Sequence, residues 1–283
     1  KYFPVPQYFS EKSPTFILKF WSMKNLYLTL AGILFFILTG TAQEIEWQNT
    51  IGGLFGDRLY SIQQTFDGGY ILGGYSSSNS SVDKTENSIG GSDYWIVKLD
   101  SLGNIQWQNT IGGSNNDELY SIQQTFDGGF ILGGVSLSNI SGDKAENTNG
   151  GQDFWIVKVG SFGSIQWQNT IGGSGYEKLN SIQQTLDGGY ILGGSSNANI
   201  SGDKSENCYG SYDYWVVKVD SLGIIQWQNT IGGSGWDELS SIQQTIDGGY
   251  ILGGFSSSNI SGDKTENCNG GEDYWIVKTD ALG

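Results

Sequence analysis

The chain alternates short apolar runs with glycine-rich turns, and the same order of runs returns every sixty residues. In the second unit this pattern predicts four strands, at Leu119–Thr125, Phe130–Val135, Phe154–Val159 and Ile165–Ile171. Asp127-Gly128-Gly129 supplies a tight hairpin turn between the first two, because glycine accepts the positive φ that such turns need. No window beyond residue 43 keeps helical spacing free of glycine, so we expect essentially no helix there.

The second and third runs of each unit are continuously apolar, whereas the fourth alternates apolar and polar residues. A sheet that is wet on one side shows clean alternation, so the continuous runs predict strands that are covered on both faces. The alternation in the fourth run is typical of an outer strand near solvent. The paired glycines after the second run, such as Gly133-Gly134, are then expected where backbones crowd as the blades converge toward a common axis.

Two tryptophans recur in every unit at the same sixty-residue step. A fixed period of this length is typical of repeats that bury their faces against one another. We therefore expect the indole rings to be structural and to lie between neighbouring sheets, although they could also stack on sugars or bases. The positions are Trp47, Trp107, Trp167 and Trp227, and Trp95, Trp155, Trp215 and Trp275.

The repeated phrases resemble those of known β-propellers. Tyr70–Gly74, followed by Asp93–Asp100 and Ile105–Trp107, resembles a kelch-type blade, and Asp100–Trp107 is similar to the tryptophan-docking turn of quinoprotein-like propellers. Over all four units the chain most resembles the propeller-like repeats of secreted bacterial surface proteins that are exported by the type IX route. The resemblance implies an all-β, kelch-like β-propeller built of four-stranded antiparallel blades.

The repeat region is expected to span 44–283, with units that begin near residues 45, 105, 165 and 225. Ile45–Gly53 matches a fourth strand without a preceding three, and the last unit, which ends near Asp280, has three strands without a fourth. The N-terminal run could complete the final blade and close a ring. An incomplete ring, cut from a longer array, agrees equally well with the sequence. The type IX route normally reads a C-terminal sorting domain, which this sequence does not show, so we expect a longer protein.

The N-terminal region is typical of a secretory signal. Residues 23–43 contain a short basic start, the apolar stretch Leu26–Leu38 and a small-residue cleavage site at Ala42, and residues 1–22 are interpreted as a non-native upstream segment. A spanning helix needs about 20 apolar residues, so the stretch predicts no stable membrane span. We expect a secreted protein at or outside the cell surface.

Charge and composition exclude several classes of function. With 14 basic and 29 acidic residues the net charge is −15, which repels phosphate backbones, so nucleic acid is not an expected partner. The chain has no histidine, and Arg58 is its only arginine. Histidine-dependent copper oxidases and sialidase-like enzymes with an arginine cluster are thereby excluded. Cys208 and Cys268 stand at equivalent places in neighbouring repeats, so we expect two unpaired thiols.

The long loop of each unit is rich in oxygen-bearing side chains. In the second unit Asp143, Glu146, Asn147 and Asp153 could ligate calcium, which prefers six to eight oxygens. The same residue types are also what ordinary turns select, and their spacing does not match an EF-hand. Apart from this calcium hypothesis, no cofactor is expected.

The units differ from one another mainly in two loops. The first comprises 54–58, 114–118, 174–178 and 234–238, and the second comprises 88–92, 148–152, 208–211 and 268–272. Loops on a rigid scaffold commonly carry recognition, so Phe55, Tyr176 and Trp236 are candidate contacts for a protein or glycan at the cell surface. Drift after duplication would produce the same variation.

Two functions therefore remain. The sequence favours a non-catalytic binding, adhesion or structural module, and the alternative is a carbohydrate-active enzyme that uses carboxylates only. Acid and base roles need two different environments, and the near-identical repeats single out no such pair.

Overall fold

The computed structural model describes residues 44–283. The chain separates into two compact units, Lys1–Glu46 and Trp47–Gly283, and the fold below is that of the second unit. The expected upstream segment 1–22, the signal peptide 23–43 and the cleavage site at Ala42 lie outside the described residues. Within 44–283 no helix is long and apolar enough to cross a membrane.

The described residues form fifteen β-strands and no α-helix, arranged as four antiparallel sheets. Each sheet is a meander, in which consecutive strands pair. Sheet 1 contains β1 (Asp57–Gln64), β2 (Tyr70–Ser76), β3 (Asp93–Leu99) and β4 (Ile105–Ile111). Sheet 2 contains β5 (Asp117–Gln124), β6 (Phe130–Ser136), β7 (Asp153–Val159) and β8 (Ile165–Ile171). Sheet 3 contains β9 (Glu177–Gln184), β10 (Tyr190–Ser196), β11 (Asp213–Val219) and β12 (Ile225–Ile231), and sheet 4 contains β13 (Asp237–Gln244), β14 (Tyr250–Ser256) and β15 (Asp273–Thr279).

The predicted strands of the second unit are confirmed to within two residues at each end. The hairpin between β5 and β6 turns at Gly128, whose φ of 81° is reached at low cost only by glycine. Its backbone bonds join Thr125 and Gly129, with the N–H of Thr125 donating to the carbonyl of Gly129 at 2.9 Å. The turn chemistry read from the sequence therefore sets the strand register.

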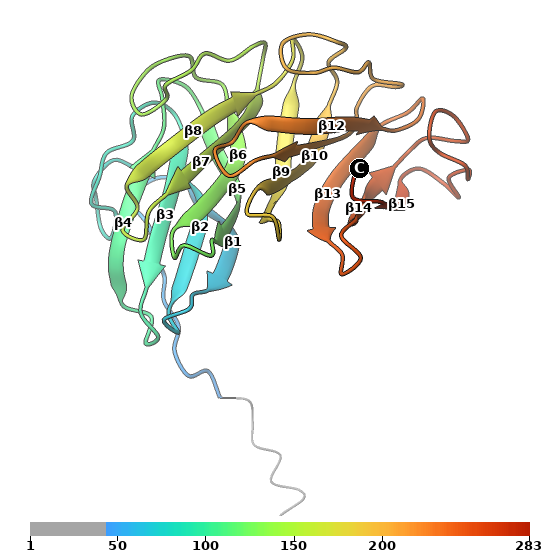
Figure 1. Cartoon of the computed structure of the whole chain (residues 1–283). Coiled ribbons are helices and arrows are strands. Elements are labelled where there is room, and N and C mark those ends of the chain that lie inside the picture. Colours follow the sequence, from blue (N-terminus) through green and yellow to red (C-terminus); the bar gives the residue numbers. More distant parts are fainter. Residues whose placement is uncertain (1–43) are drawn as a thin grey trace, which may run out of the picture. The chain divides into compact units, whose positions relative to one another are not determined.

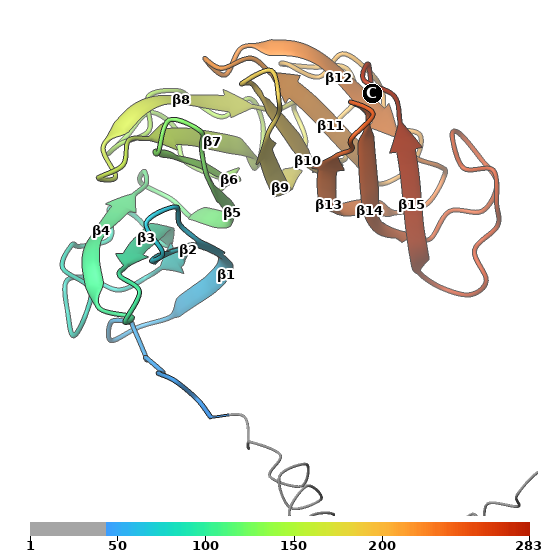
Figure 2. The same ribbon diagram turned by 60° about the horizontal axis from the view of Figure 1, so that its bottom comes forward.

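The four sheets follow one another along an arc, and their first strands lie side by side (Figures 1 and 2). Side chains of the preceding sheet bond to the free edges of β5, β9 and β13: the N–H of Gln124 donates to Oε1 of Gln63 at 2.6 Å, and the N–H of Ile122 donates to Oγ of Ser61 at 3.2 Å. Sheet 1 lies at one end of the arc and sheet 4 at the other (Figure 2). The described residues therefore form repeated sheets but no closed ring.

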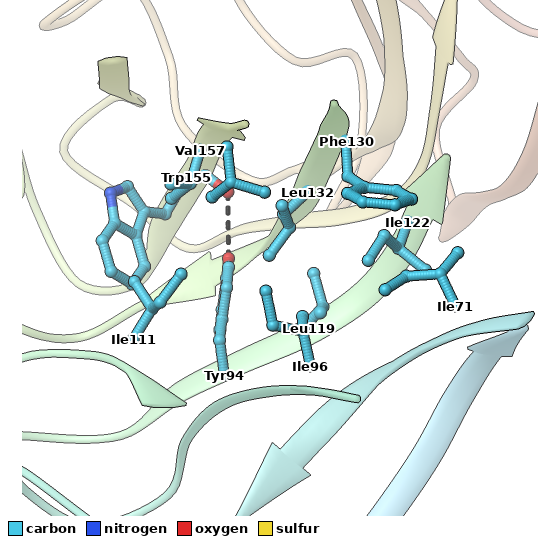
Figure 3. Close-up of a cluster of buried hydrophobic side chains, with 11 residues drawn as sticks. Ile71, Tyr94, Ile96, Ile111, Leu119, Ile122, Phe130, Leu132, Trp155 and Val157 are labelled. Carbon is cyan, nitrogen blue, oxygen red and sulfur yellow. Dashed lines mark hydrogen bonds between the residues drawn. The ribbon is translucent and has the colours of Figure 1, made fainter. Parts of the chain in front are cut away.

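Three apolar cores lie between neighbouring sheets. In the core between sheets 1 and 2, Tyr94 and Ile96 of β3 pack against Leu119 of β5 and against Leu132 and Trp155 of sheet 2, and all are buried (Figure 3). The same positions build the cores between sheets 2 and 3 and between sheets 3 and 4. The prediction that the second and third strands are covered on both faces is thus confirmed for the two central sheets.

The two tryptophan series occupy different depths. Trp95, Trp155 and Trp215 are buried, while Trp275 at the end of the arc is half-buried. The rings on the outermost strands are only partly covered, and each packs at an interplanar angle of 60–61° against an aromatic residue of the next sheet, as Trp107 does against Phe130 at 5.9 Å between ring centroids. Both series therefore contribute to contacts between sheets, but only the series that contains Trp95, Trp155 and Trp215 reaches the interior.

Gly133 is required by the packing of one sheet on the next. A Cβ atom at this position would lie 2.7 Å from Cδ2 of Leu179 and 3.0 Å from Cγ2 of Ile182, both buried side chains of β9. Real Cβ atoms do not approach neighbours so closely, so glycine lets β6 and β9 come together. The close neighbours of Gly133 are side chains of the next sheet and not backbone atoms, so the crowding differs from the backbone crowding that was expected.

One predicted strand is wrong. Ile45–Gly53 carries the sequence of a fourth strand but forms no strand in the structure. A strand is stabilised by its ladder of hydrogen bonds, and no strand edge of the described chain pairs with this segment. The absence of a fourth strand from the last unit is confirmed.

The two cysteines are free, as expected. The thiol of Cys208 donates to the carbonyl of Ser196 at 3.0 Å, in the place where Ser88 bonds to Ser76 in sheet 1. Burial raises the pKa of the Cys208 thiol to about 12, so it stays protonated and unreactive at neutral pH.

Candidate binding face

Both variable loops lie at the same end of the sheets. Because the strands of each sheet run antiparallel, the connection into the first strand and the long connection between the second and third strands share one end. The tight hairpins, such as 125–129 and 160–164, lie at the opposite end. We call the end that carries the variable loops the loop face.

On the loop face, variable loops of neighbouring sheets are joined by backbone hydrogen bonds. The N–H of Gly91 in sheet 1 donates to the carbonyl of Asn115 at 3.0 Å, and the N–H of Gly151 in sheet 2 donates to the carbonyl of Gly175 at 2.9 Å. Ser211 and Gly235 form the corresponding bond between sheets 3 and 4 at 2.9 Å. The sequence differences therefore come together on one continuous, hydrogen-bonded rim.

The three predicted contact residues are exposed on this rim. Phe55, Tyr176 and Trp236 keep 68%, 54% and 43% of their surface accessible. They do not form one cluster, because they belong to the entrances of β1, β9 and β13, and sheet 2 carries Asn115 at the position of Phe55 and Asn116 at the position of Tyr176 and Trp236. The most extended aromatic surface lies where sheets 3 and 4 meet.

Sequence reasoning missed three members of that aromatic surface, Tyr209, Tyr212 and Phe255. Tyr212 lies 5.4 Å from Trp236 between ring centroids, and Trp236 lies 6.0 Å from Phe255. Tyr209 is also exposed, and it lies against Gly262 in the long loop of sheet 4. The signal for Tyr209 was present, since it stands inside the variable range 208–211, whereas the pairing of Tyr212 with Trp236 depends on the neighbouring sheet.

The four candidate calcium ligands make separate hydrogen bonds to the backbone. Oδ2 of Asp143 accepts from the N–H of Gly112 at 3.2 Å, Oε2 of Glu146 from Thr170 at 2.6 Å, and Oδ1 of Asn147 from Ile140 at 3.1 Å. Asp153 is buried and accepts from the N–H of Asn149 at 2.5 Å. Within residues 44–283, no group of three or more carboxylate or cysteine side chains is arranged to hold a metal ion.

These bonds anchor the long loop to its own sheet and to the preceding one. Nζ of Lys144 is buried, donates to Oγ1 of Thr170, and lies 5.3 Å from the ring centre of Trp155. The bond from Gly112 to Asp143 reaches the connection that follows sheet 1. The loop that carries the variable positions is therefore fixed in place, as a recognition surface requires.

Pairs of carboxyl groups are buried beneath the loop face. Asp153 and Glu177 come from neighbouring sheets and are fully buried, and burial together with the neighbouring Asp153 raises the pKa of Glu177 to about 8. Burial likewise raises the pKa of Asp93 to about 6. Such shifts are typical of catalytic acids, but a catalytic group must reach its substrate, and these side chains have no exposed surface.

No protein-family model matches the chain, and no curated protein matches it. The features that define the loop face are therefore structural. They are a hydrogen-bonded rim of variable loops and a group of exposed aromatic rings where sheets 3 and 4 meet.

Proposed function

We propose that the chain is a non-catalytic binding module that recognises a protein or glycan at the cell surface through its loop face. The observation that carries the proposal is that the variable loops of neighbouring sheets hydrogen-bond to one another on one rim, while the framework beneath them is repeated nearly unchanged. Variation concentrated on a fixed surface is typical of recognition.

Within this proposal the four sheets are blades of a kelch-like β-propeller assembly, and the chain acts outside the cell after removal of a signal peptide. The meander topology of each sheet and the packing of first strands along an arc support the propeller interpretation. The acidic balance of the chain favours a protein or glycan partner over nucleic acid.

The aromatic surface gives the proposal its most specific form. Tyr176, Tyr209 and Trp236 offer exposed rings, which bury a large apolar area against a sugar face or an apolar side chain at low cost in conformational entropy. We expect these rings to dominate the binding energy, as aromatic residues commonly do at interfaces.

Arrays of glycans and of cell-surface proteins, followed by titration of any hit, test the proposal. Trp236→Ala and Tyr176→Ala should weaken binding at least about tenfold, while Phe126→Ala, an exposed ring on the opposite hairpin end, should leave it unchanged. Equal affinity of all variants would contradict the role of the loop face. Hydrolysis of a glycan that is abolished by one Asp or Glu substitution would establish the carbohydrate-active enzyme instead.

A further inference from the structure

Large apolar side chains project from the tight hairpins, at the end of the sheets opposite the loop face. We call this end the hairpin end and these side chains the tips, and each tip is at least 66% exposed. The first row of tips lies between the first and second strands, and the second row lies between the third and fourth strands. The first row is Phe66, Phe126, Leu186 and Ile246, and the second row is Leu102, Phe162 and Leu222.

The exposure of the tips does not depend on the place of a sheet in the arc. Sheets 2 and 3 each have a neighbouring sheet on both sides. Their tips, Phe126, Phe162, Leu186 and Leu222, are nevertheless between 66% and 85% exposed, whereas Trp155 on a covered face is fully buried. A further sheet beside any of these would therefore lengthen the two rows without covering them.

The tip positions keep their hydrophobicity but not their shape. In the first row, threonine precedes the tip and Asp-Gly-Gly follows it in all four units, while the tip itself is phenylalanine, phenylalanine, leucine and isoleucine. In the second row, leucine, phenylalanine and leucine stand between a serine and a glycine. Turns select polar residues and glycine, so an exposed turn position that drifts freely should acquire polar residues. The pattern indicates a partner that recognises apolar surface without recognising the form of each side chain.

Hydrogen bonds hold the backbone of the tips in place. The N–H of Phe66 donates to Oε1 of Gln124 in the next sheet at 2.8 Å, and the N–H of Phe126 donates to Oε1 of Gln184 at 2.8 Å. The N–H of Leu102 donates to Oδ1 of Asp100 in its own turn at 2.9 Å. Because these donors are already bonded, the tips can enter an apolar medium without leaving a backbone N–H unpaired.

The charges at the hairpin end are neutralised or negative. The aspartate that follows each first-row tip forms an ion pair with a lysine of the third strand, at 2.9–3.0 Å between Nζ and Oδ2. The hairpin segments themselves contain no lysine or arginine, and Asp100 and Asp220 stand two residues before tips of the second row. Peripheral proteins bind anionic lipid through exposed basic residues, so this end offers no attraction to such lipid. The ion pairs are Lys98–Asp67, Lys158–Asp127, Lys218–Asp187 and Lys278–Asp247.

We propose that the hairpin end is a second interaction surface, which inserts its tips into the interfacial region of a zwitterionic lipid bilayer. A bilayer is deformable, so it contacts many tips at once and needs no pocket that matches phenylalanine in one sheet and isoleucine in another. A folded protein partner would recognise shape, and anionic headgroups would meet the aspartates. The surface lies opposite the loop face, so the inference goes beyond the proposed function.

A fluorescent label beside one tip tests the proposal on the full chain. Ser161→Cys, in a Cys208→Ser, Cys268→Ser background, places a polarity-sensitive fluorophore next to Phe162 without removing a tip. On vesicles of phosphatidylcholine its emission should shift to the blue and should be quenched by lipids that carry a spin label near the headgroup. The same fluorophore in a Leu54→Cys variant, on the loop face, should show neither effect. A label beside Phe162 that stays in water, or equal responses at the two positions, would overturn the proposal.

A matched pair of triple variants assigns the lipid contact to the tips. The pair is needed because the apolar stretch Leu26–Leu38 could by itself carry the full chain to lipid. Burial of one such side chain is worth about tenfold or more in affinity, so replacing three tips by aspartate should reduce the response of the label at least about tenfold. Replacing three equally apolar, exposed side chains of the long loops should leave the response unchanged, and equal losses in the two variants would contradict the proposal. The first variant is Phe126→Asp, Leu186→Asp, Leu222→Asp, and the control is Ile140→Asp, Ile200→Asp, Ile260→Asp.

The charge of the lipid and the class of the partner complete the test. Exchange of part of the phosphatidylcholine for phosphatidylserine should weaken the response of the label. A response that requires the anionic lipid would overturn the proposal. A response to cell-surface proteins in solution, with none to phosphatidylcholine, would also overturn it and would assign the hairpin end to a protein partner. The vesicles carry neither protein nor glycan, so the result is independent of the test of the loop face.

Discussion

The hydroxyl of Tyr94 donates to the backbone carbonyl of Trp155 at 2.9 Å, and its ring lies 4.8 Å from the indole of the same residue. One residue of sheet 1 therefore contacts both the backbone and the side chain of the core tryptophan of sheet 2 (Figure 3). Tyr214 makes the same pair of contacts with Trp275, whereas Phe154 stacks on Trp215 without the hydrogen bond. The ring contact thus occurs at all three interfaces between sheets, and the hydrogen bond occurs at the two where the third strand carries tyrosine.

Tyr94→Phe should separate the two contributions. The ring packing is kept and one buried hydrogen bond is lost, so the free energy of unfolding should fall by about 1 kcal/mol. Tyr94→Ala, which also removes the ring, should cost about 3–5 kcal/mol. Urea unfolding at equilibrium measures both, and similar losses for the two variants would show that the ring adds little.

Gly133→Ala should lower the free energy of unfolding. Alanine reduces the conformational entropy of the unfolded chain, which by itself would stabilise the protein, but here the steric effect in the folded chain is larger. The added Cβ would press on Leu179 and Ile182, and overpacking of a buried contact costs about 1–3 kcal/mol. Gly271→Ala is the control, since a Cβ there meets nothing within 4 Å. If thermal melting shows the same small change for both, β6 and β9 are not in the close contact described.

Glu177 should make stability fall as pH rises from 6 to 8. Its pKa is about 8 in the folded chain because of burial and the adjacent Asp153, against 4.5 in the unfolded chain. The folded state therefore holds a proton that the unfolded state releases, so this stabilisation is complete below pH 4.5 and is lost as the pH passes 8. The loss between pH 6 and 8 should be about 2 kcal/mol.

The melting temperature of Glu177→Gln, followed over the same pH range, isolates this effect. The amide cannot ionise, so the curve of the variant should be flatter than that of the parent chain. Parallel curves would mean that Glu177 is ionised in the folded protein at pH 6. The comparison uses the slope only, because the substitution also alters the bonds that Glu177 accepts from Gly173 and Ser196.

The strands and their covered faces could be predicted from sequence because they depend on local information. Continuous apolar runs such as Phe154–Val157 and the turn at Gly128 each identify their own structure without reference to another repeat. The sixty-residue period then predicts that equal units cover one another. The strand prediction was wrong at Ile45–Gly53 because it also relied on local sequence alone. The segment has the sequence of a strand, but no strand edge of the described residues pairs with it.

The candidate site could be predicted only in part. The exposure of Trp236 followed from its place in a variable loop, but its neighbour Tyr212 belongs to a different sheet. The loop carboxylates were harder still: Glu146 bonds to the N–H of Thr170, 24 residues away, and Asp153 meets Glu177 across two sheets. Composition identifies such residues as oxygen donors but does not tell whether a backbone amide, a shared proton or a calcium ion satisfies them, so the calcium hypothesis stays a prediction.

The central claim is that repeated apolar sheets bury one another's faces, and the free energy of unfolding of Trp155→Ala tests it most directly. The indole is fully buried between sheets 1 and 2, so its removal should cost about 3–5 kcal/mol, whereas Phe126→Ala at an exposed hairpin should change stability by less than about 0.5 kcal/mol. An unfolding curve of Trp155→Ala that coincides with that of the parent chain would place the ring in solvent and contradict the account.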